Sequence, residues 1–563
     1  MTNYKKAFDT CDKATAYKLN SVLDRLDEFD YDATAIDDTI ETVSGSNLSA
    51  THKITRSATL VVAASDSSEK SKAQADYVCD GVADNEEIQA AVNALASCGG
   101  KIILLEGNYR GGNISITTQN IQISGVRGAK YTYTAADSNA AFTISSENVH
   151  IDTLHIDCAT LAGHSIYFNG AANCSVRHCI CENAINDNIL VFNASHDIQI
   201  CNNVTRYTAA TGPYCGIEVT KDCYDVLISE NIVYENASGI RAHCHTGETL
   251  ERITIVNNIL HGNKEYGIYI SGSLGTFKNA IISNNMLNEP DATQYAVYVA
   301  KVIGVTCTGN HVTDAGLAGM FFHDGTTHGT IANNVISNST SYGISVNISS
   351  DLCLDSNIIN SPGSHGCMID TSNNISVRGG VVALGQKHGI YLKASDYCRV
   401  SGVTLKNNGQ AGGTYNDINI ASTSTYNTIS DNYISADLTT KTQYGVIEIA
   451  PTDDYNKIIN NTISGNSVAS VHKSGANTIV AGNRGYVTEN KGTATITIGQ
   501  TSVNVVHGMA KAPTRVQLTP TTATAGKQYY VSAKAATTFT ITIDSETDDD
   551  ITDDVSFDWQ AVI

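Results

Sequence analysis

Four polar residues in the first half of the chain carry the side chains that acid–base chemistry needs: Asp187, Glu218, Arg241 and His243. An arginine can pair with the carboxylate of a bound molecule such as a uronic acid, while a histidine removes a proton and a glutamate donates one or orients the base. We take these four as candidate catalytic residues, with Tyr269 as an alternative base. The competing interpretation is a Glu218–Arg241 salt bridge that only stabilises the fold.

Aromatic residues follow in the same sequence pattern, at Tyr269, Tyr298 and Phe321, with His323 two residues beyond the last. Aromatic rings suit the C–H surfaces of sugars, but they also suit a contact between protein chains. We therefore predict a substrate-binding stripe about 10 Å long over three neighbouring strands, and we leave a protomer interface open as the alternative.

Other chemistry is less well supported by the residues. A glycosidase needs two carboxylates about 5 to 10 Å apart, and Asp187 and Glu218 would lie in adjacent repeats but offset sideways. His243, His245 and Glu248 have ligand side chains for zinc, yet the sequence fixes no complete set of ligands. We predict no metal and no cofactor, and we interpret the His-Asp-Gly segment at 323–325 as a turn.

A repeat must position these candidates, and residues 253–286 contain one whole unit with the start of the next. Alternating apolar residues run into Asn257 and Asn258, and a Gly-Ile pair at 267 and 268 follows a loop. The last asparagine or its equivalent recurs at Asn203, Asn231, Asn258, Asn285, Asn310, Asn334, Asn357, Gly380, Gly402, Asn432, Asn461 and Asn483. Gaps of 22 to 30 residues predict an all-β parallel β-helix with strands stacked about 4.8 Å apart.

Strand periodicity then assigns side chains to the two faces of one sheet. The inward positions are Ile217, Ile240, Ile268, Val297, Met320, Ile344 and Ile390. The residues that follow them point outward, which puts Glu218, Arg241, Tyr269, Tyr298 and Phe321 in one line. Asparagine and glycine are interpreted as corner residues, because both tolerate a left-handed backbone and stacked amides can hydrogen-bond along the axis.

The two ends of the chain differ from the repeat. Residues 1–57 carry a heptad of apolar residues and are predicted to form a helical, coiled-coil stalk. Residues 58–490 form the β-helix, with a capping helix that starts near Asp84 and ends before Gly99 and Gly100. Residues 491–563 alternate in short strands and are predicted to be a small β-sandwich. Its acidic loop, which starts at Asp544, is interpreted as solvated rather than as a calcium site.

Composition restricts the possible partners and compartment. A formal charge of −21, from 35 basic and 56 acidic residues, argues against nucleic acid as a partner. No apolar run suits membrane insertion, and the first residues lack a signal peptide, so we expect synthesis in the cytoplasm. The 15 cysteines are predicted to be reduced core residues; those at 174, 223, 353 and 398 occupy strand-like positions.

The segment DGVADNEEIQAAVNA, followed by GGKIILLEGNY, resembles the opening of right-handed parallel β-helix proteins of the pectate-lyase (pectin-lyase-like) superfold. The resemblance covers about residues 76 to 485, and that superfold includes lyases, polygalacturonases, epimerases and phage tailspikes. The polygalacturonase motifs are not present in order and the pectate-lyase calcium carboxylates cannot be mapped, so the resemblance implies no catalytic residue.

The stalk and the terminal module together resemble a phage tailspike or tail fibre. This resemblance implies a virion-tail protein, a homotrimer attached to the virion or baseplate through its N-terminal region, and receptor binding to a cell-surface polysaccharide. Cleavage of that polysaccharide by a lyase or hydrolase activity is a further possibility. A non-viral surface adhesin or injection-system fibre is the alternative.

Overall fold

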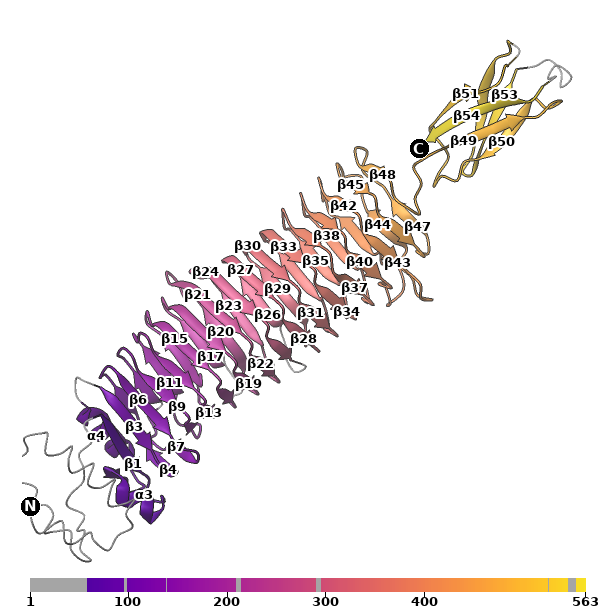
Figure 1. The fold of residues 1–563 in the computed structure, drawn as a ribbon. Helices are drawn as coiled ribbons and strands as arrows, with labels where there is room; N and C mark the ends of the chain where they lie inside the picture. Colours follow the sequence, from indigo (N-terminus) through magenta and orange to yellow (C-terminus); the bar gives the residue numbers. More distant parts are fainter. Residues whose placement is uncertain are drawn as a thin grey trace, which may run out of the picture. The chain divides into compact units, whose positions relative to one another are not determined.

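The computed structural model describes residues 58–95, 99–137, 139–208, 214–289, 295–524, 526–544 and 553–563. From Thr59 to Ala481 the chain winds through three parallel β-sheets, here called sheets A, B and C (Figure 1). Each turn, or rung, contributes a strand to each sheet, and about 15 rungs are stacked. The predicted parallel β-helix is confirmed. The predicted stalk at residues 1–57 lies outside the described residues.

Sheet A has 18 strands. They are β1 (Thr59–Ala63), β2 (Tyr77–Val78), β3 (Gly100–Leu104), β6 (Ile121–Gly125), β9 (His150–Asp152), β12 (Ser175–Arg177), β15 (His196–Cys201), β18 (Tyr224–Ser229), β21 (Thr249–Val256), β24 (Thr276–Ser283), β27 (Val302–Thr308), β30 (Thr327–Ala332), β33 (Ser350–Asp355), β36 (Ser376–Arg378), β39 (Arg399–Ser401), β42 (Thr428–Ser430), β45 (Lys457–Ile459) and β48 (Ile479–Ala481).

Sheet B has 15 strands, most of them three residues long. They are β4 (Gly107–Gly111), β7 (Ala129–Tyr133), β10 (His155–Asp157), β13 (Ile180–Glu182), β16 (Val204–Arg206), β19 (Ile232–Tyr234), β22 (Ile259–His261), β25 (Met286–Asn288), β28 (His311–Thr313), β31 (Val335–Ser337), β34 (Ile358–Asn360), β37 (Val381–Ala383), β40 (Thr404–Lys406), β43 (Tyr433–Ser435) and β46 (Thr462–Ser464).

Sheet C also has 15 strands and carries all but one of the candidate residues. They are β5 (Ile114–Ile116), β8 (Ala140–Ile144), β11 (His164–Asn169), β14 (Ile189–Phe192), β17 (Cys215–Thr220), β20 (Ser238–His243), β23 (Ile268–Ser271), β26 (Tyr295–Ala300), β29 (Ala318–His323), β32 (Ile344–Asn347), β35 (Cys367–Asp370), β38 (Ile390–Lys393), β41 (Ile418–Ala421), β44 (Tyr444–Glu448) and β47 (Ala469–His472). Asp187, which precedes β14, is the exception.

The corners between sheets A and B are held by a ladder of buried asparagines. The backbone N–H and the side-chain Nδ2 of Asn231 both donate to Oδ1 of Asn258, at 2.9 and 3.0 Å. The same pair of bonds links successive rungs from Asn203 to Asn357. The residue before the ladder, as at Asn257, takes the left-handed conformation with φ 57°. The predicted stacking of asparagine amides is therefore confirmed.

Two details of the predicted repeat are wrong. Gly380 continues the ladder position, but its partner on the next rung is Val403 rather than Gly402, because Val381 pairs with Thr404. Gly267 lies at the bend before β23, but it does not take the left-handed conformation that was expected of a corner glycine, since its φ is not positive. A Cβ atom there would lie 2.7 Å from the carbonyl oxygen of Ala296 and 2.8 Å from Leu287 Cδ2, so close packing between rungs excludes a side chain.

Two short helices, α3 (Glu69–Gln74) and α4 (Asn85–Ala94), precede the regular rungs. As predicted, α4 buries Ile88 and Val92 against the end of the core. Asp84 occupies the position before the first turn, but its carboxylate accepts from the amides of Gly81 and Arg110, at 2.6 and 2.7 Å. It therefore ties α4 to β4 instead of capping the helix. Neither helix has the length and apolar character to cross a membrane.

The last strands form two antiparallel sheets, β49-β54-β51 and β50-β53-β52. Their bounds are β49 (Glu489–Ile496), β50 (Ser502–Val506), β51 (Arg515–Pro520), β52 (Tyr529–Lys534), β53 (Thr538–Ile543) and β54 (Val555–Val562). Phe539, Phe557 and Trp559 are buried in the cluster that these strands share. The division into domains at residues 58–490 and 491–563 stays a prediction, and most of the acidic loop after Asp544 lies outside the described residues.

The cysteines of the described residues are free thiols, and nearly all are buried. Burial raises the pKa of the Cys223 and Cys398 thiols to about 12, which keeps them protonated. Cys353 differs from the prediction: it pairs with Thr330 and Ser376 on the outer face of sheet A and is partly exposed.

Candidate functional site

The outer face of sheet C carries the candidate residues in the predicted register. One line of paired residues, the outer line of sheet C, runs through Glu218, Arg241, Tyr269, Tyr298 and Phe321. A second line, two residues further along each strand, includes His243 and His323. The inward residues that come one position before the first line, from Ile217 to Ile390, are fully buried. The strand periodicity therefore predicted correctly which side chains share this face.

The aromatic residues form a continuous stack, the aromatic ladder, made of Tyr266, Tyr269, Tyr295, Tyr298 and Phe321. The rings of Tyr269 and Tyr298 are parallel within 2°, with centroids 4.9 Å apart. Tyr295 stacks on Phe321 at 4.7 Å, and the ring of Tyr266 meets Tyr269 edge-on at 4.8 Å. The members are half-buried, so part of each residue stays accessible to solvent. His323, the fourth predicted binding residue, stacks on Phe321 at 5.1 Å.

Tyr266 and Tyr295 were missed by the sequence reasoning, although a signal for them exists. Each precedes a predicted residue by three positions, in the segments Tyr-Gly-Ile-Tyr at 266–269 and Tyr-Ala-Val-Tyr at 295–298. Because the two segments lie on adjacent rungs in register, the repeated spacing places four tyrosines together. A search for residue pairs repeated between rungs would have found them.

A second aromatic group lies further along sheet C, formed by Tyr342, His365, His388, Tyr391 and Tyr415. The imidazoles of His365 and His388 are parallel within 3° with centroids 5.0 Å apart. Tyr391 packs edge-on against His365 at 5.2 Å and at a tilt against His388 at 5.1 Å. Each imidazole Nδ1 accepts a backbone N–H from the next rung, at 3.2 and 2.9 Å. This group extends the aromatic face of sheet C towards the C-terminal rungs.

The four candidate catalytic residues also come together, and we call them the polar cluster. Nδ1 of His243 lies 3.0 Å from Oε1 of Glu218, close enough for an ion pair although the ring is not aligned for a hydrogen bond. The guanidinium of Arg241 lies over the ring of Tyr269 at 5.2 Å, which joins the cluster to the aromatic ladder. Asp187, Glu218 and His243 are each less than 10% exposed.

Asp187 and Glu218 are closer than the sequence predicted. Asp187 lies in the corner before β14, three positions ahead of Leu190, the register partner of Glu218, so it is offset along the strand as predicted. Even so, carboxylate oxygens of both residues lie within 4.8 Å of each other and of Cys215 Sγ. Burial and the neighbouring charge of Glu218 raise the pKa of Asp187 well above its usual range. Burial would also raise the pKa of Glu218, but contacts with His243 and Asp187 and the charge of Arg241 lower it. The pair therefore shares one proton.

Two neighbours of the polar cluster were not predicted. Nδ1 of His164 lies 3.6 Å from Oδ2 of Asp187, and burial lowers the pKa of that histidine. The backbone N–H of Cys215 donates to Oδ1 of Asp187 at 2.8 Å. No sequence motif links these two residues to the cluster, because each reaches it across a rung. His245, which the sequence grouped with His243, does lie beside it, with the two Nε2 atoms 3.1 Å apart.

The polar cluster suits acid–base chemistry better than glycoside hydrolysis by two carboxylates. A glycosidase keeps its carboxyl groups about 5 to 9.5 Å apart so that a sugar or a water fits between them. Asp187 and Glu218 interact directly, which leaves no such space. A protonated carboxyl, a carboxylate, an imidazole and a guanidinium side by side can instead hold an anion and move a proton.

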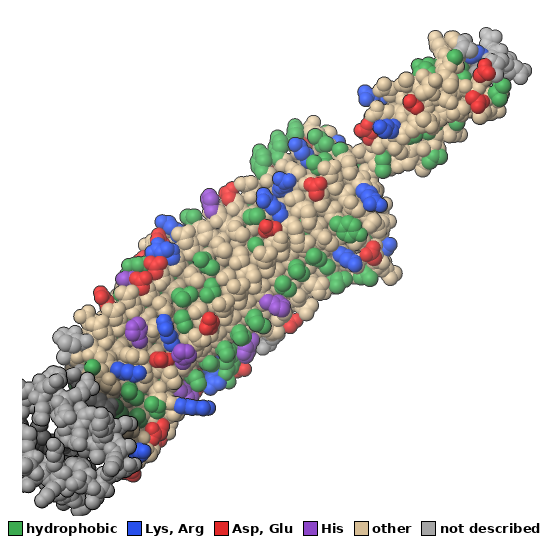
Figure 2. All heavy atoms as spheres, in the orientation of Figure 1, with side chains coloured by type: hydrophobic (Ala, Val, Ile, Leu, Met, Phe, Trp, Pro, Cys, Tyr) green, Lys and Arg blue, Asp and Glu red, His purple; other side chains and the backbone are tan. Residues whose placement is uncertain are grey.

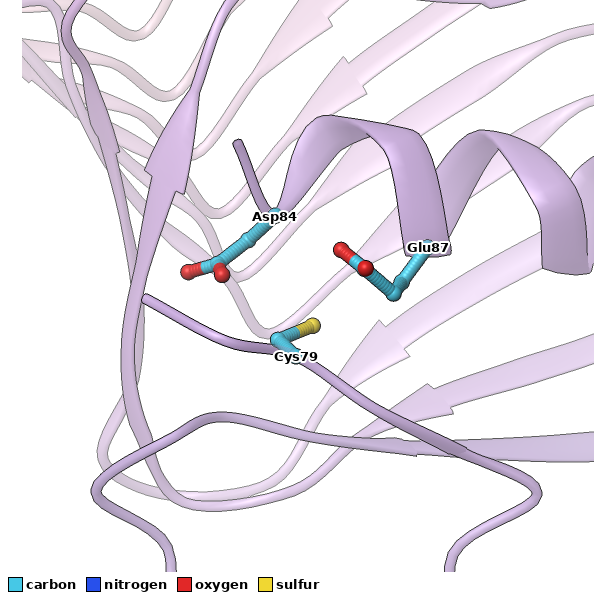
Figure 3. A group of neighbouring side chains, drawn as sticks. All are labelled: Cys79, Asp84 and Glu87. Carbon is cyan, nitrogen blue, oxygen red and sulfur yellow. The ribbon is translucent and has the colours of Figure 1, made fainter. Parts of the chain in front are cut away.

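Neither cluster of possible metal ligands in the described residues is well suited to a cation. In the first, Asp187, Cys215 and Glu218 lie beside the charge of Arg241, and the pKa of the Cys215 thiol is raised well above its usual range by burial. In the second, Cys79 precedes α4 while Asp84 and Glu87 lie at its start (Figure 3). There the Asp84 carboxylate already accepts two backbone N–H groups.

Comparisons with known proteins agree on the architecture. The family model described as a periplasmic copper-binding protein (NosD) matches residues 138–342, and the model of a right-handed β-helix region matches residues 272–434. No curated protein sequence matches the chain.

Solved structures with a similar fold include two groups of proteins. The A-module of the mannuronan C-5 epimerase AlgE6 from Azotobacter vinelandii is 16% identical, covers 72% of this chain and 96% of its own, and superposes with a TM-score of 0.33. A mutant tailspike protein of E. coli bacteriophage HK620, solved in complex with a pentasaccharide, is 13% identical, covers 85% of this chain and 89% of its own, and gives a TM-score of 0.46.

The parallel register of all three sheets and the matched β-helix model lead to one conclusion. The chain is a right-handed parallel β-helix protein.

Proposed function

We propose that this chain binds a polysaccharide lengthwise along the outer face of sheet C. The observation that carries the proposal is the aromatic ladder, whose rings recur on successive rungs in a straight line. Because Tyr269 and Tyr298 stack on each other, they turn ring edges and hydroxyl groups outward rather than ring faces. A regular row of such groups matches a ligand that is itself a repeating chain of hydroxyl-bearing units.

The polar cluster adds a charged end to this face. Arg241 contacts the ring of Tyr269 and lies one rung from Glu218, so a glycan on the ladder would reach the guanidinium. An arginine fork pairs well with a carboxylate, which favours an acidic polysaccharide.

Binding can be tested on an array of bacterial capsular and O-antigen polysaccharides, followed by calorimetry with any glycan that binds. The double variant Tyr269→Ala/Tyr298→Ala should weaken binding at least tenfold, since buried tyrosines dominate such contacts. The matched control is Tyr397→Ala/Tyr426→Ala, which truncates another parallel stack, 5.2 Å apart and exposed, outside sheet C. Equal losses in both variants, or no binding to any glycan, would contradict the proposal.

A second candidate function is acid–base cleavage of a uronic-acid glycan, favoured by the shared proton of Asp187 and Glu218 beside Arg241. Arg241 would hold the uronate carboxylate while His243 removes the proton from the adjacent ring carbon. The freed electron pair forms a C=C bond as the bond to the glycosidic oxygen breaks. The Asp187–Glu218 pair returns a proton to that oxygen.

This reaction leaves an unsaturated sugar end that absorbs ultraviolet light. Incubation with a glycan that binds should raise the absorbance, and Asp187→Asn should abolish the rise while binding persists. A bound glycan that stays intact with the wild-type protein would reject the lyase activity without affecting the binding proposal.

We further propose that the chain serves as a tailspike or tail fibre on a virion tail, as a homotrimer attached through its N-terminal region. The heptad of residues 1–57 and the strand-rich C-terminal segment support this role. A cellular surface adhesin or injection-system fibre would use the same binding face. Antibody labelling of purified virions, with labelling of the cell surface as the competing outcome, distinguishes the two.

A further inference from the structure

The outer face of sheet B carries a line of apolar side chains that the core does not use. We call it the apolar column and define it as the first residues of the strands from β13 to β37. Consecutive members pair in register, as Ile232 with Ile259 and Ile259 with Met286. Eight of the nine members are isoleucine, valine or methionine, and the ninth is His311.

These side chains face solvent in the described chain. Ile232, Ile259, Met286 and Ile358 are 38%, 42%, 54% and 43% exposed, whereas the middle residue of the same strands, such as Leu260, is buried in the core. The space-filling view in Figure 2 shows hydrophobic side chains in lines along the stack of rungs. The other aliphatic members, Ile180, Val204, Val335 and Val381, are half-buried. A straight line of part-exposed and exposed aliphatic residues over nine rungs, interrupted once by His311, exceeds what scattered surface residues produce.

The chemistry of the column restricts what can cover it. Branched aliphatic side chains have no ring faces or hydroxyl groups for a sugar. The column has no lysine or arginine for lipid phosphates, and the chain has a formal charge of −21. What remains is an apolar protein surface.

The spacing of the residues in the column favours a second copy of this chain as the binding partner. Its members recur about every 4.8 Å along the stack, so a partner with the same rung spacing can keep contact with every member. Over nine rungs the column is about 38 Å long. A strip of that length needs a width of only about 21 Å, one short strand and its flanking corners, to reach the roughly 800 Å² per partner of a stable interface.

We propose that the apolar column is the interface through which copies of this chain associate side by side. The column lies on sheet B, whereas the proposed glycan site lies on sheet C, so each proposal can fail without the other. In the assembly the exposed aliphatic side chains become buried, and the regular rungs of one copy pack along those of the next.

Met286 provides a built-in probe of this contact. It is 54% exposed in the single chain, whereas Met320, Met368 and Met509 are at most 7% exposed. Hydrogen peroxide converts an accessible methionine thioether to the sulfoxide and is itself reduced to water. In the full-length wild-type protein, mass spectrometry should show Met286 oxidising at least tenfold more slowly than in a chain whose column is disrupted.

The disrupting variant is Ile232→Ser/Ile259→Ser/Ile358→Ser, which leaves Met286 in place and changes only part-exposed side chains. The matched control is Ile281→Ser/Ile303→Ser/Ile479→Ser, three isoleucines of sheet A that are 40%, 48% and 52% exposed. The first variant should expose Met286 to oxidation and lower the mass measured by light scattering or weaken the assembly, with circular dichroism unchanged. The control should do neither.

Three outcomes would overturn the proposal. One is a wild-type protein that is monomeric at high micromolar concentration. Another is wild-type Met286 that oxidises as fast as in the sheet B variant. The last is a sheet A control that exposes Met286 equally. If the ends of the chain also hold the copies together, the mass alone does not test the column. The oxidation rate of Met286 still does, because it reports whether the column itself is covered.

Discussion

At the scale of single residues, the stacked imidazoles of His365 and His388 show how a rung changes the chemistry of its neighbours. Burial and the nearby His388 lower the pKa of His365 to about 3, and burial lowers the pKa of His388 to about 4. Both imidazoles are therefore neutral in the folded chain at neutral pH. Their Nδ1 atoms accept backbone hydrogen bonds, which protonation would break.

These shifts predict a loss of stability in acid. An unfolded histidine has a pKa near about 6.5 and binds a proton more readily than the folded one. The two neutral imidazoles therefore contribute their full stabilisation above about pH 6.5. This stabilisation is lost as the pH falls through the folded pKa values of about 4 and about 3. The double variant His365→Gln/His388→Gln should remove on the order of 3 kcal/mol of this pH dependence for each histidine, measured by denaturant unfolding between pH 7 and pH 4.

An equally steep acid loss in the His365/His388 double variant would show that other groups cause it.

The candidate residues show how far the sequence predicts single positions. Glu218, Arg241 and Tyr269 lie inside strands, so a period of two places them on one face and the repeat aligns them. Asp187 lies in a corner, where the path of the chain depends on packing and not on periodicity. Its contact with Glu218 could not be predicted for that reason, and the same holds for His164.

At the scale of the element, the glycine that opens many sheet C strands sets the spacing between rungs. At Gly343 a Cβ atom would lie 2.2 Å from Ile359 Cγ2 and 2.7 Å from the carbonyl oxygen of Gly366 on the next rung. The position therefore needs glycine for close approach, and φ is not the reason. The sequence marks these strands correctly by their glycines but suggests the wrong physical role for them.

The corresponding prediction is that Gly343→Ala forces apart the rungs that contain β32 and β35. Overpacking of this kind costs about 1–3 kcal/mol. Amide hydrogen exchange in the peptides of those two strands should accelerate, because local opening becomes easier. Gly112→Ala is the control: its Cβ atom would lie 3.4 Å from the nearest atom, Ala135 Cβ, and its φ is not positive. A Gly343 variant that exchanges as slowly as this control would refute the steric argument.

At the scale of the whole molecule, the β-helix separates two kinds of surface on different sheets. Sheet C combines aromatic and charged side chains, whereas the apolar column of sheet B is aliphatic except for His311 and has no lysine, arginine or carboxylate. Both are lines of side chains rather than pockets, because every surface of a stack is repeated at the rung spacing. The sequence repeat predicts that such lines exist. The partner that each line binds depends on how exposed its side chains are, and the sequence repeat does not determine that exposure.

A stack of this kind should tolerate the loss of one whole rung. Met320 pairs with Ile344, so removal of residues 320–343 joins Gly319 to Ile344 and restores the Gly-Ile junction of the strand. The asparagine ladder also closes, because Asn310 then meets Asn357 in place of Asn334. The shortened protein should keep its circular dichroism and cooperative unfolding, since each rung contacts only its neighbours.

A deletion of residues 332–343, half that length, provides the contrast. It leaves β29 in place but removes the last residue of β30, all of β31 and the ladder residue Asn334, so the next strands enter out of register. A slip of register turns core side chains outward, and this variant should aggregate or lose its cooperative transition. If both deletions behaved alike, the stability of the β-helix would not depend on rung-by-rung pairing. If the whole-rung deletion alone folds, its aromatic ladder will lack Phe321 and its glycan affinity should fall while its rungs stay intact.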